Sequence, residues 1–251
     1  MNGTAGYLAG FDPIETAPAL IAVVVGLLVW RRHTADRRAR LFLALAASEL
    51  AFGLPLLLML YVPQTPVAVA AIDGALVTLG LLSAALFLHF GLAFPHARPW
   101  LRRGHMSSVY TAAVIMGIVP IGAALAGIGA QAQLQDVFDS VLILVGPLVL
   151  IASVTACIAI YRSYREMTAD ERRRYRLPVL GVLVGMIAGL VMDVVLTTFV
   201  TVFAEAGVMM WTANTVELAV MVAELVLPLF FFMAAVRYRL LEHHAQDYVT
   251  N

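Results

Sequence analysis

Residues 161–193 read YRSYREMTADERRRYRLPVLGVLVGMIAGLVMD, and this stretch joins six arginines to an almost purely apolar run. The run begins near residue 177 and continues to about residue 203. A helix needs about 20 such residues to cross roughly 30 Å of hydrocarbon. Because a backbone in lipid must satisfy its polar groups within the segment, the run is helical. The stretch therefore predicts a membrane-spanning helix preceded by a strongly basic loop.

The whole chain repeats this alternation of apolar runs and short polar connections. Its 251 residues are 62% hydrophobic and 13% charged, whereas an ordinary soluble domain carries about 25% charged residues. Seven runs are long enough to cross a membrane, at approximately 14–30, 41–62, 74–95, 107–130, 141–162, 177–203 and 216–237. We expect an all-α integral membrane protein: a seven-transmembrane helix bundle over residues 14–237, a short extracytoplasmic segment at 1–13 and a cytoplasmic tail at 238–251.

The basic residues predict the orientation of the bundle. All sixteen are arginine, and they fall in alternate connections and in the tail, while the remaining three connections contain none. Positive charge marks the cytoplasmic side, so we expect the N-terminus outside and the C-terminus in the cytoplasm. High alanine and arginine content without lysine is typical of a GC-rich genome and indicates a prokaryotic protein. We expect its location to be the bacterial cytoplasmic (inner) membrane. Candidates for contact with a cytoplasmic partner or lipid phosphate are Arg172, Arg173, Arg174, Arg237 and Arg239.

Four ionisable side chains fall well inside the expected spans, away from their ends, where an unpaired charge is costly. Asp193 and Glu224 have similar predicted depths on helices joined by a short connection. We hypothesise that they share a proton or bind a polar ligand, although both are equally compatible with hydrogen-bonded packing. Glu49 and His89 both fall in the inner half of the bundle, where a structural pair is the favoured interpretation over a binding site.

A stripe of small residues leads up to Asp193. Gly181, Gly185 and Gly189 follow one another at four-residue spacing, which places them on one face of a helix. Such a face allows a second helix to approach closely. The sequence leaves open whether that helix belongs to the same bundle or to the second copy of a homodimer.

The sequence predicts no catalytic, metal or cofactor site. Cys157 is the single cysteine, one histidine falls inside a span, and neither an HExxH motif nor a glycine-rich phosphate loop is present. The absence of lysine excludes a retinal-type receptor, which needs a Schiff base. We therefore expect a protein that is not an enzyme, with membrane lipid and no nucleic acid among its partners.

Three stretches, read together, carry a resemblance to a known family. They are FLHFGLAFPHARPWLRR (87–103), YRSYREMTADERRRYRLPVLGVLVG (161–185) and LPLFFFMAAVRYRLLE (227–242). They resemble the membrane-embedded N-terminal region of bacterial sensor histidine kinases of the seven-helix type. His89 and Pro95 match the family's HF-x-L-x-FP motif, and Arg237 and Arg239 match its RYRL motif, which leads into cytoplasmic signalling domains. The EHHAQDYVTN that follows here departs from the family pattern, and residues 1–251 contain no kinase domain.

The resemblance implies a sensor half that acts on a separate partner, or a fragment of a longer sensor. We accordingly expect a non-enzymatic membrane sensor of a two-component type of system. It would receive a stimulus in the bundle or outer leaflet and relay it through its arginine-rich cytoplasmic face. Two alternatives remain: a small transporter or channel component whose carboxylates relay protons or cations, and an assembly subunit of a membrane complex that docks through the glycine stripe.

Overall fold

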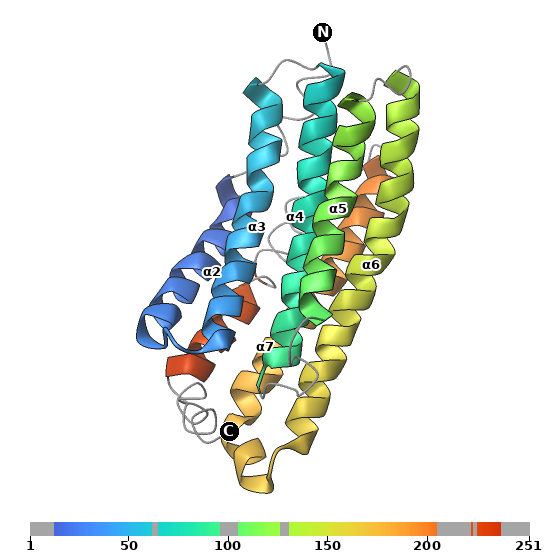
Figure 1. The fold of residues 1–251 in the computed structure, drawn as a ribbon. Helices are drawn as coiled ribbons and strands as arrows, with labels where there is room; N and C mark the ends of the chain where they lie inside the picture. The colour runs from blue at the N-terminus through green and yellow to red at the C-terminus, as the bar shows by residue number, and fades with distance from the viewer. Residues whose placement is uncertain are drawn as a thin grey trace.

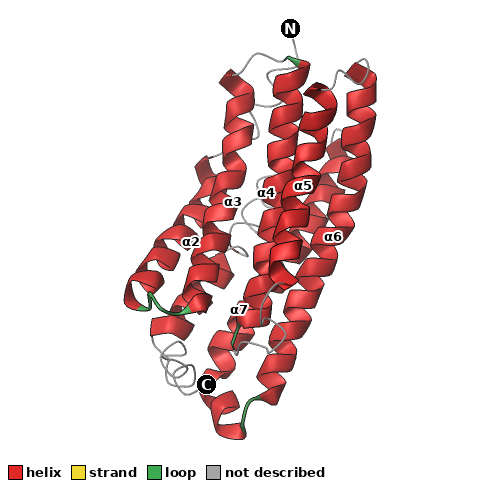
Figure 2. Ribbon diagram, viewed as in Figure 1, coloured by secondary structure: helices red, strands yellow, loops and turns green. Residues whose placement is uncertain are grey.

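The computed structural model describes residues 13–61, 65–95, 105–125, 131–204, 222 and 225–236. These residues form helices and short connections, with no strand among them (Figure 2). The prediction of an all-α protein is therefore confirmed for this part of the chain. The helices are α2 (Pro13–Arg32), α3 (Arg37–Tyr61), α4 (Pro66–Ala93), α5 (His105–Leu125), α6 (Gln131–Glu166) and α7 (Ala169–Ala204), followed by the last helix (Leu225–Val236).

The helices form an up-and-down bundle, and consecutive helices are neighbours (Figure 1). Helix α4 is central because it contacts α3, α5 and α6. The short turns between α2 and α3 and between α6 and α7 lie at the lower end of the bundle in Figure 1, as does the end of α4. The described arginines belong to helix ends at this lower end.

Two helices are long and apolar enough to cross a membrane, at Val67–Ala93 and Pro147–Glu166. Shorter apolar helical stretches among the described residues are Met106–Val119, Tyr175–Ala188 and Leu225–Val236. Several helices begin before the apolar runs from which they were predicted. Helix α6 starts at Gln131 and α7 at Ala169. A helix can begin wherever its first backbone N–H groups find partners, so its start need not coincide with the start of the apolar stretch.

Helix α7 begins with a capping box that explains its early start. The Thr168 hydroxyl accepts a hydrogen bond from the Glu171 backbone N–H at 3.3 Å, and the Glu171 carboxylate accepts one from the Thr168 backbone N–H at 2.9 Å. This reciprocal arrangement satisfies two backbone donors at the N-terminus of the helix. Only Met167 and Thr168 separate α6 from α7, so the two helices are forced to run in opposite directions.

Helix α4 is bounded by a cap and a proline turn. Thr65 accepts from the Ala68 backbone N–H at 3.2 Å, and Pro66 occupies the first turn, where its missing N–H costs nothing. At the other end Phe94 is extended, with φ −111° and ψ 141°, and the Phe94–Pro95 peptide bond is cis. The backbone therefore turns away from the helix within the FP motif.

The glycine stripe of α7 packs against the last helix of the same chain. A Cβ atom added at Gly185 would lie 2.6 Å from the backbone nitrogen of Leu227, and one added at Gly181 would overlap the Phe230 ring. Only glycine permits this close approach of two backbones. The face at Gly181 and Gly185 is thus used within the bundle, while the surroundings of Gly189 lie outside the described residues.

The outer faces of the bundle are apolar and exposed. Ile151 is 62% exposed and Leu177 63% exposed, and neighbouring aliphatic side chains on the same helices are also open. Isolated exposed apolar residues are common on soluble proteins, but contiguous apolar faces are not. The exposed members of α5 and α6 are Val109, Val114, Ile115, Ile118, Val119, Leu148, Leu150, Ile151, Val154 and Ile158.

Candidate functional site

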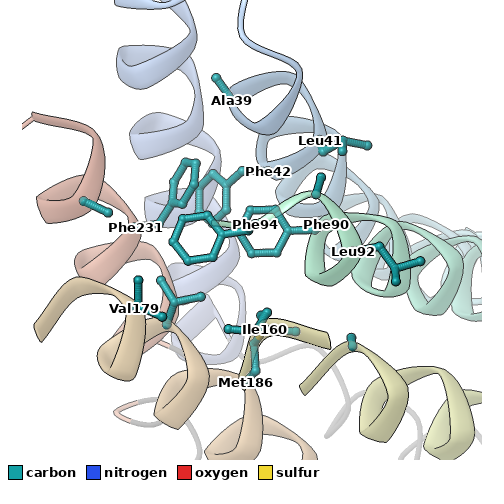
Figure 3. Packing of buried hydrophobic residues seen from close by; sticks show 14 of the residues in the cluster. Ala39, Leu41, Phe42, Phe90, Leu92, Phe94, Ile160, Val179, Met186 and Phe231 are labelled. Carbon is teal, nitrogen blue, oxygen red and sulfur yellow. The ribbon is translucent and has the colours of Figure 1, made fainter. Parts of the chain in front are cut away.

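Four phenylalanine rings form an aromatic cluster (Figure 3). The cluster is near the arginine-bearing end of the bundle, because Phe42 follows Arg40 by two residues in the first turns of α3. Phe42 comes from α3, Phe231 from the last helix, and Phe90 and Phe94 from the end of α4. Each ring is at most 1% exposed. The cluster joins three segments that are far apart in the sequence.

The geometry of these rings shows tight packing. Phe42 and Phe231 stack with their centroids 4.1 Å apart at an interplanar angle of 21°. Phe90 meets Phe231 edge-on at 5.4 Å and stacks with Phe94 at 5.3 Å. Offset stacking and edge-to-face contacts are the favourable geometries for aromatic pairs. Phe231 therefore anchors the last helix to α3 and α4.

A chain of hydrogen bonds lies beside this cluster. A guanidinium nitrogen of Arg37, Nη2, is 2.8 Å from His89 Nε2, and His89 Nδ1 is 2.7 Å from the Tyr110 hydroxyl. Arginine can only donate, so Nε2 accepts from Arg37. The proton of the neutral ring must then be on Nδ1, which donates to Tyr110. His89, only 6% exposed, thereby connects α4 to the first turn of α3 and to α5.

A second arginine ties the same turn to the end of α4. Arg38 is 6% exposed and forms an ion pair with Asp36 at 2.7 Å. Its Nη1 donates to the Pro95 backbone carbonyl at 2.6 Å. Asp36 also accepts from the Arg38 backbone N–H at 2.7 Å, which caps α3. A buried guanidinium requires such partners because its desolvation is costly.

Glu49 lies on an exposed part of α3 and is held by a serine of α4. The Ser83 hydroxyl donates to the Glu49 carboxylate, and Ser48 is hydrogen-bonded to Ser83 at 3.2 Å and to the Leu45 carbonyl at 2.7 Å. The hydrogen bonds of Glu49 and His89 described here go to different partners. The two residues thus mark two separate polar positions between α3 and α4.

Several other predicted residues, or their side chains, lie outside the part of the chain that the structure describes. Asp193 belongs to α7, but its side chain lies outside those described, and Glu224 lies outside the described residues altogether. The same holds for Arg237 and Arg239, and for the side chain of Arg174.

Two of the predicted cytoplasmic arginines can be placed. Arg173 is exposed, and Arg172 is partly buried. The Nε atom of Arg172 is buried and has no hydrogen-bond partner within the described part of the chain. That part also contains no group of three or more histidine, cysteine or acidic residues that could hold a metal ion.

Sequence reasoning missed most of this polar network. It treated Arg37 and Arg38 only as markers of orientation, and it did not single out Tyr110, Ser83 or the phenylalanines. The HF-x-L-x-FP motif could have indicated this network, because its histidine, phenylalanines and proline all make contacts in it. His89 binds Arg37 and Tyr110, the two phenylalanines enter the aromatic cluster, and the carbonyl of Pro95 receives Arg38.

No protein-family model matches the chain, and comparison with curated proteins finds no match.

Proposed function

We propose that the chain is a seven-helix membrane sensor, with its N-terminus outside and its C-terminus in the cytoplasm, that passes a stimulus to a separate cytoplasmic partner. The observation that carries this proposal is the aromatic cluster. Phe231 packs against Phe42 and Phe90, six residues before Arg237, where the basic tail begins. A shift of α3 or α4 would therefore act on the segment that leads into the tail.

The distribution of surface residues supports the membrane part of the proposal. The outer faces of α5 and α6 carry exposed aliphatic side chains, and water would make such faces unfavourable. The described arginines gather at one end of the bundle, as positive charge does on the cytoplasmic side. The two helices with the length and composition to span a membrane agree with this arrangement.

Labelling of single cysteines tests the orientation. In a Cys157→Ser background, Thr34→Cys reports the turn between α2 and α3, and Val67→Cys reports the opposite end of the bundle; both positions are exposed. An impermeant maleimide should label Val67→Cys in intact cells and Thr34→Cys only after lysis. Labelling of Thr34→Cys in intact cells would overturn the orientation.

A genetic comparison tests the sensor role. In the organism that encodes the chain, Phe231→Ala should reproduce the changes in transcript levels caused by deletion, while Leu229→Ala, at an exposed position, should restore the normal pattern. Phe231→Leu keeps apolar volume and separates loss of ring packing from loss of folding. If Phe231→Ala and Phe231→Leu both behave as wild type at equal protein levels, the relay through the cluster is wrong.

The proposal assigns reception of the stimulus to Asp193 and Glu224, and contact with the partner or lipid to the basic end. A two-state relay requires a ligand or proton that interacts differently with the two arrangements. Carboxylates at similar depth can provide this difference by sharing a proton. Asp193→Asn and Glu224→Gln variants that preserve the full transcript response at every pH would remove this assignment.

Proton or cation transport is the second candidate, and Glu49 favours it. Its carboxylate is exposed on α3 and accepts from Ser83, and carboxylates within membrane helices commonly form relays. Purified protein in liposomes should then dissipate a pH gradient, and Glu49→Gln should abolish the flux. Equal flux in protein-free and protein-containing liposomes would exclude this function.

A further inference from the structure

The hydrogen bonds of His89 fix which ring nitrogen carries its proton. The Arg37 guanidinium has no acceptor atom, so the 2.8 Å contact requires a bare Nε2. The same ring then offers Nδ1–H to the Tyr110 oxygen at 2.7 Å. The direction of donation therefore runs from Arg37 through His89 to Tyr110, and only the neutral ring can complete it.

Addition of one proton to His89 breaks the hydrogen bond that its ring accepts from Arg37. The only free ring position is Nε2, and a proton there converts the acceptor of Arg37 into a donor. Two cationic groups would then face each other at a contact distance of 2.8 Å and repel one another. Because Arg37 is exposed, its side chain can turn away into the solvent. The contact to Tyr110 is unaffected, because Nδ1 still donates and the phenol oxygen still accepts.

We propose that Arg37, His89 and Tyr110 form a proton-operated latch, in which protonation of His89 at Nε2 expels the Arg37 side chain and breaks the hydrogen-bonded link from the first turn of α3 through His89 to α5. The latch depends only on the contacts between α3, α4 and α5, so it does not require that the protein be a sensor rather than a transporter.

The surrounding groups do not replace the lost contact. Immediately before α3, Asp36 is engaged by both the side chain and the backbone N–H of Arg38. On α5 the facing group is Tyr110. On α6 the titratable groups packed against the same apolar cluster are Cys157 and Tyr164, and the acid at that end of the helix is its last residue, Glu166. The described residues of the last helix include no ionisable side chain.

The position of the latch gives its release a structural effect. Arg37 opens α3, and Phe42 of the aromatic cluster lies five residues further along the same helix. The Arg38 contacts to Asp36 and Pro95 remain when Arg37 leaves. Release therefore loosens the base of α3 on its α5 side while its contact with the end of α4 is retained.

Nitrogen NMR of the full chain in lipid nanodiscs tests the latch directly. With 15N-labelled histidine, the signals that disappear in His89→Gln belong to His89 among the six histidines. At pH 8 they should show a protonated Nδ1 and an unprotonated Nε2, and on lowering the pH toward 4 Nε2 should become protonated. An Nε2–H tautomer at pH 8 would overturn the proposal.

A distance measurement tests the release. Spin labels at Thr34→Cys and Ala112→Cys, both exposed sites, in a Cys157→Ala background report the α3 base against α5. The peak in the distance between the two labels at neutral pH should be lost at the pH at which Nε2 is protonated. It should return at pH 8, and the helical circular dichroism should stay unchanged throughout, which shows that the protein has not unfolded.

Two variants separate the latch from a general effect of acid. His89→Gln should keep the neutral-pH distance at every pH, because its amide accepts from Arg37, donates to Tyr110 and cannot take up a proton. Arg40→Gln, at an exposed arginine on the same helix, should respond as wild type. A pH response that persists in His89→Gln, or a wild-type distance that stays fixed while His89 titrates, would refute the latch.

Discussion

Replacement of Phe231 by alanine should be the most destabilising single change in the last helix. The ring is 0% exposed and contacts three other rings, with centroid separations of 4.1, 5.4 and 6.0 Å. Phe→Ala substitutions in soluble cores cost about 3–5 kcal/mol, from lost transfer energy and from the cavity left behind. In a lipid environment the transfer part is small because acyl chains are as apolar as the core.

The cavity and the lost ring contacts therefore dominate, and we expect a loss of about 2–4 kcal/mol in the free energy of unfolding. Unfolding by sodium dodecyl sulfate in mixed micelles, followed by circular dichroism, measures this quantity. Leu229→Ala is the matched control, since Leu229 is on the same helix and 51% exposed, and it should change stability by less than about 0.5 kcal/mol. Equal stability of the two variants would mean that the cluster does not hold the last helix.

Three further substitutions test other contacts. Gly185→Ala should destabilise the bundle by about 1–3 kcal/mol, because its methyl group would press on Leu227. Gly122→Ala, whose methyl group meets nothing within 4 Å, should be neutral or stabilising in the same unfolding assay. The opposite ranking of the two variants would exclude close packing at Gly185. Arg38→Met should lower the free energy of unfolding by about 3–5 kcal/mol, because it removes the cation that pairs with the Asp36 carboxylate. The double variant Arg38→Met, Asp36→Asn should recover part of that loss in thermal melts. No recovery would contradict the ion pair. Thr168→Ala should cost about 1 kcal/mol through loss of the α7 cap, with Thr34→Ala unaffected, and equal melting temperatures would show that the cap contributes nothing.

Much of the helical architecture was predictable because it depends on composition. The apolar runs indicated helices, and the four-residue spacing of Gly181 and Gly185 indicated a close helix contact that the structure assigns to Leu227 and Phe230. Helix starts such as Ala169 were not predicted, because the capping side chains of Thr168 and Glu171 extend the helix beyond its apolar stretch.

The polar network could not be predicted from the sequence, because it depends on how the helices are rotated against one another. Depth along a span can be estimated from residue number, but the rotation of one helix against another cannot. Arg37 was read as a charge in a loop, whereas it opens a helix and reaches His89, 52 positions away in the sequence. The sequence placed Glu49 and His89 together in the inner half of the bundle, yet Glu49 bonds to Ser83, whereas His89 bonds to Arg37 and Tyr110.

The aromatic cluster also has a consequence for how the protein is made. Phe42 is synthesised early, Phe90 and Phe94 follow, and Phe231 comes last. Neighbouring helices can associate as they emerge, but the stacked pair of Phe42 and Phe231 cannot close until the Leu225–Val236 helix has left the ribosome. A product that stops before Phe231 keeps Phe42, Phe90 and Phe94 without the ring that contacts all three, so it leaves at one site an apolar surface that the last helix would cover.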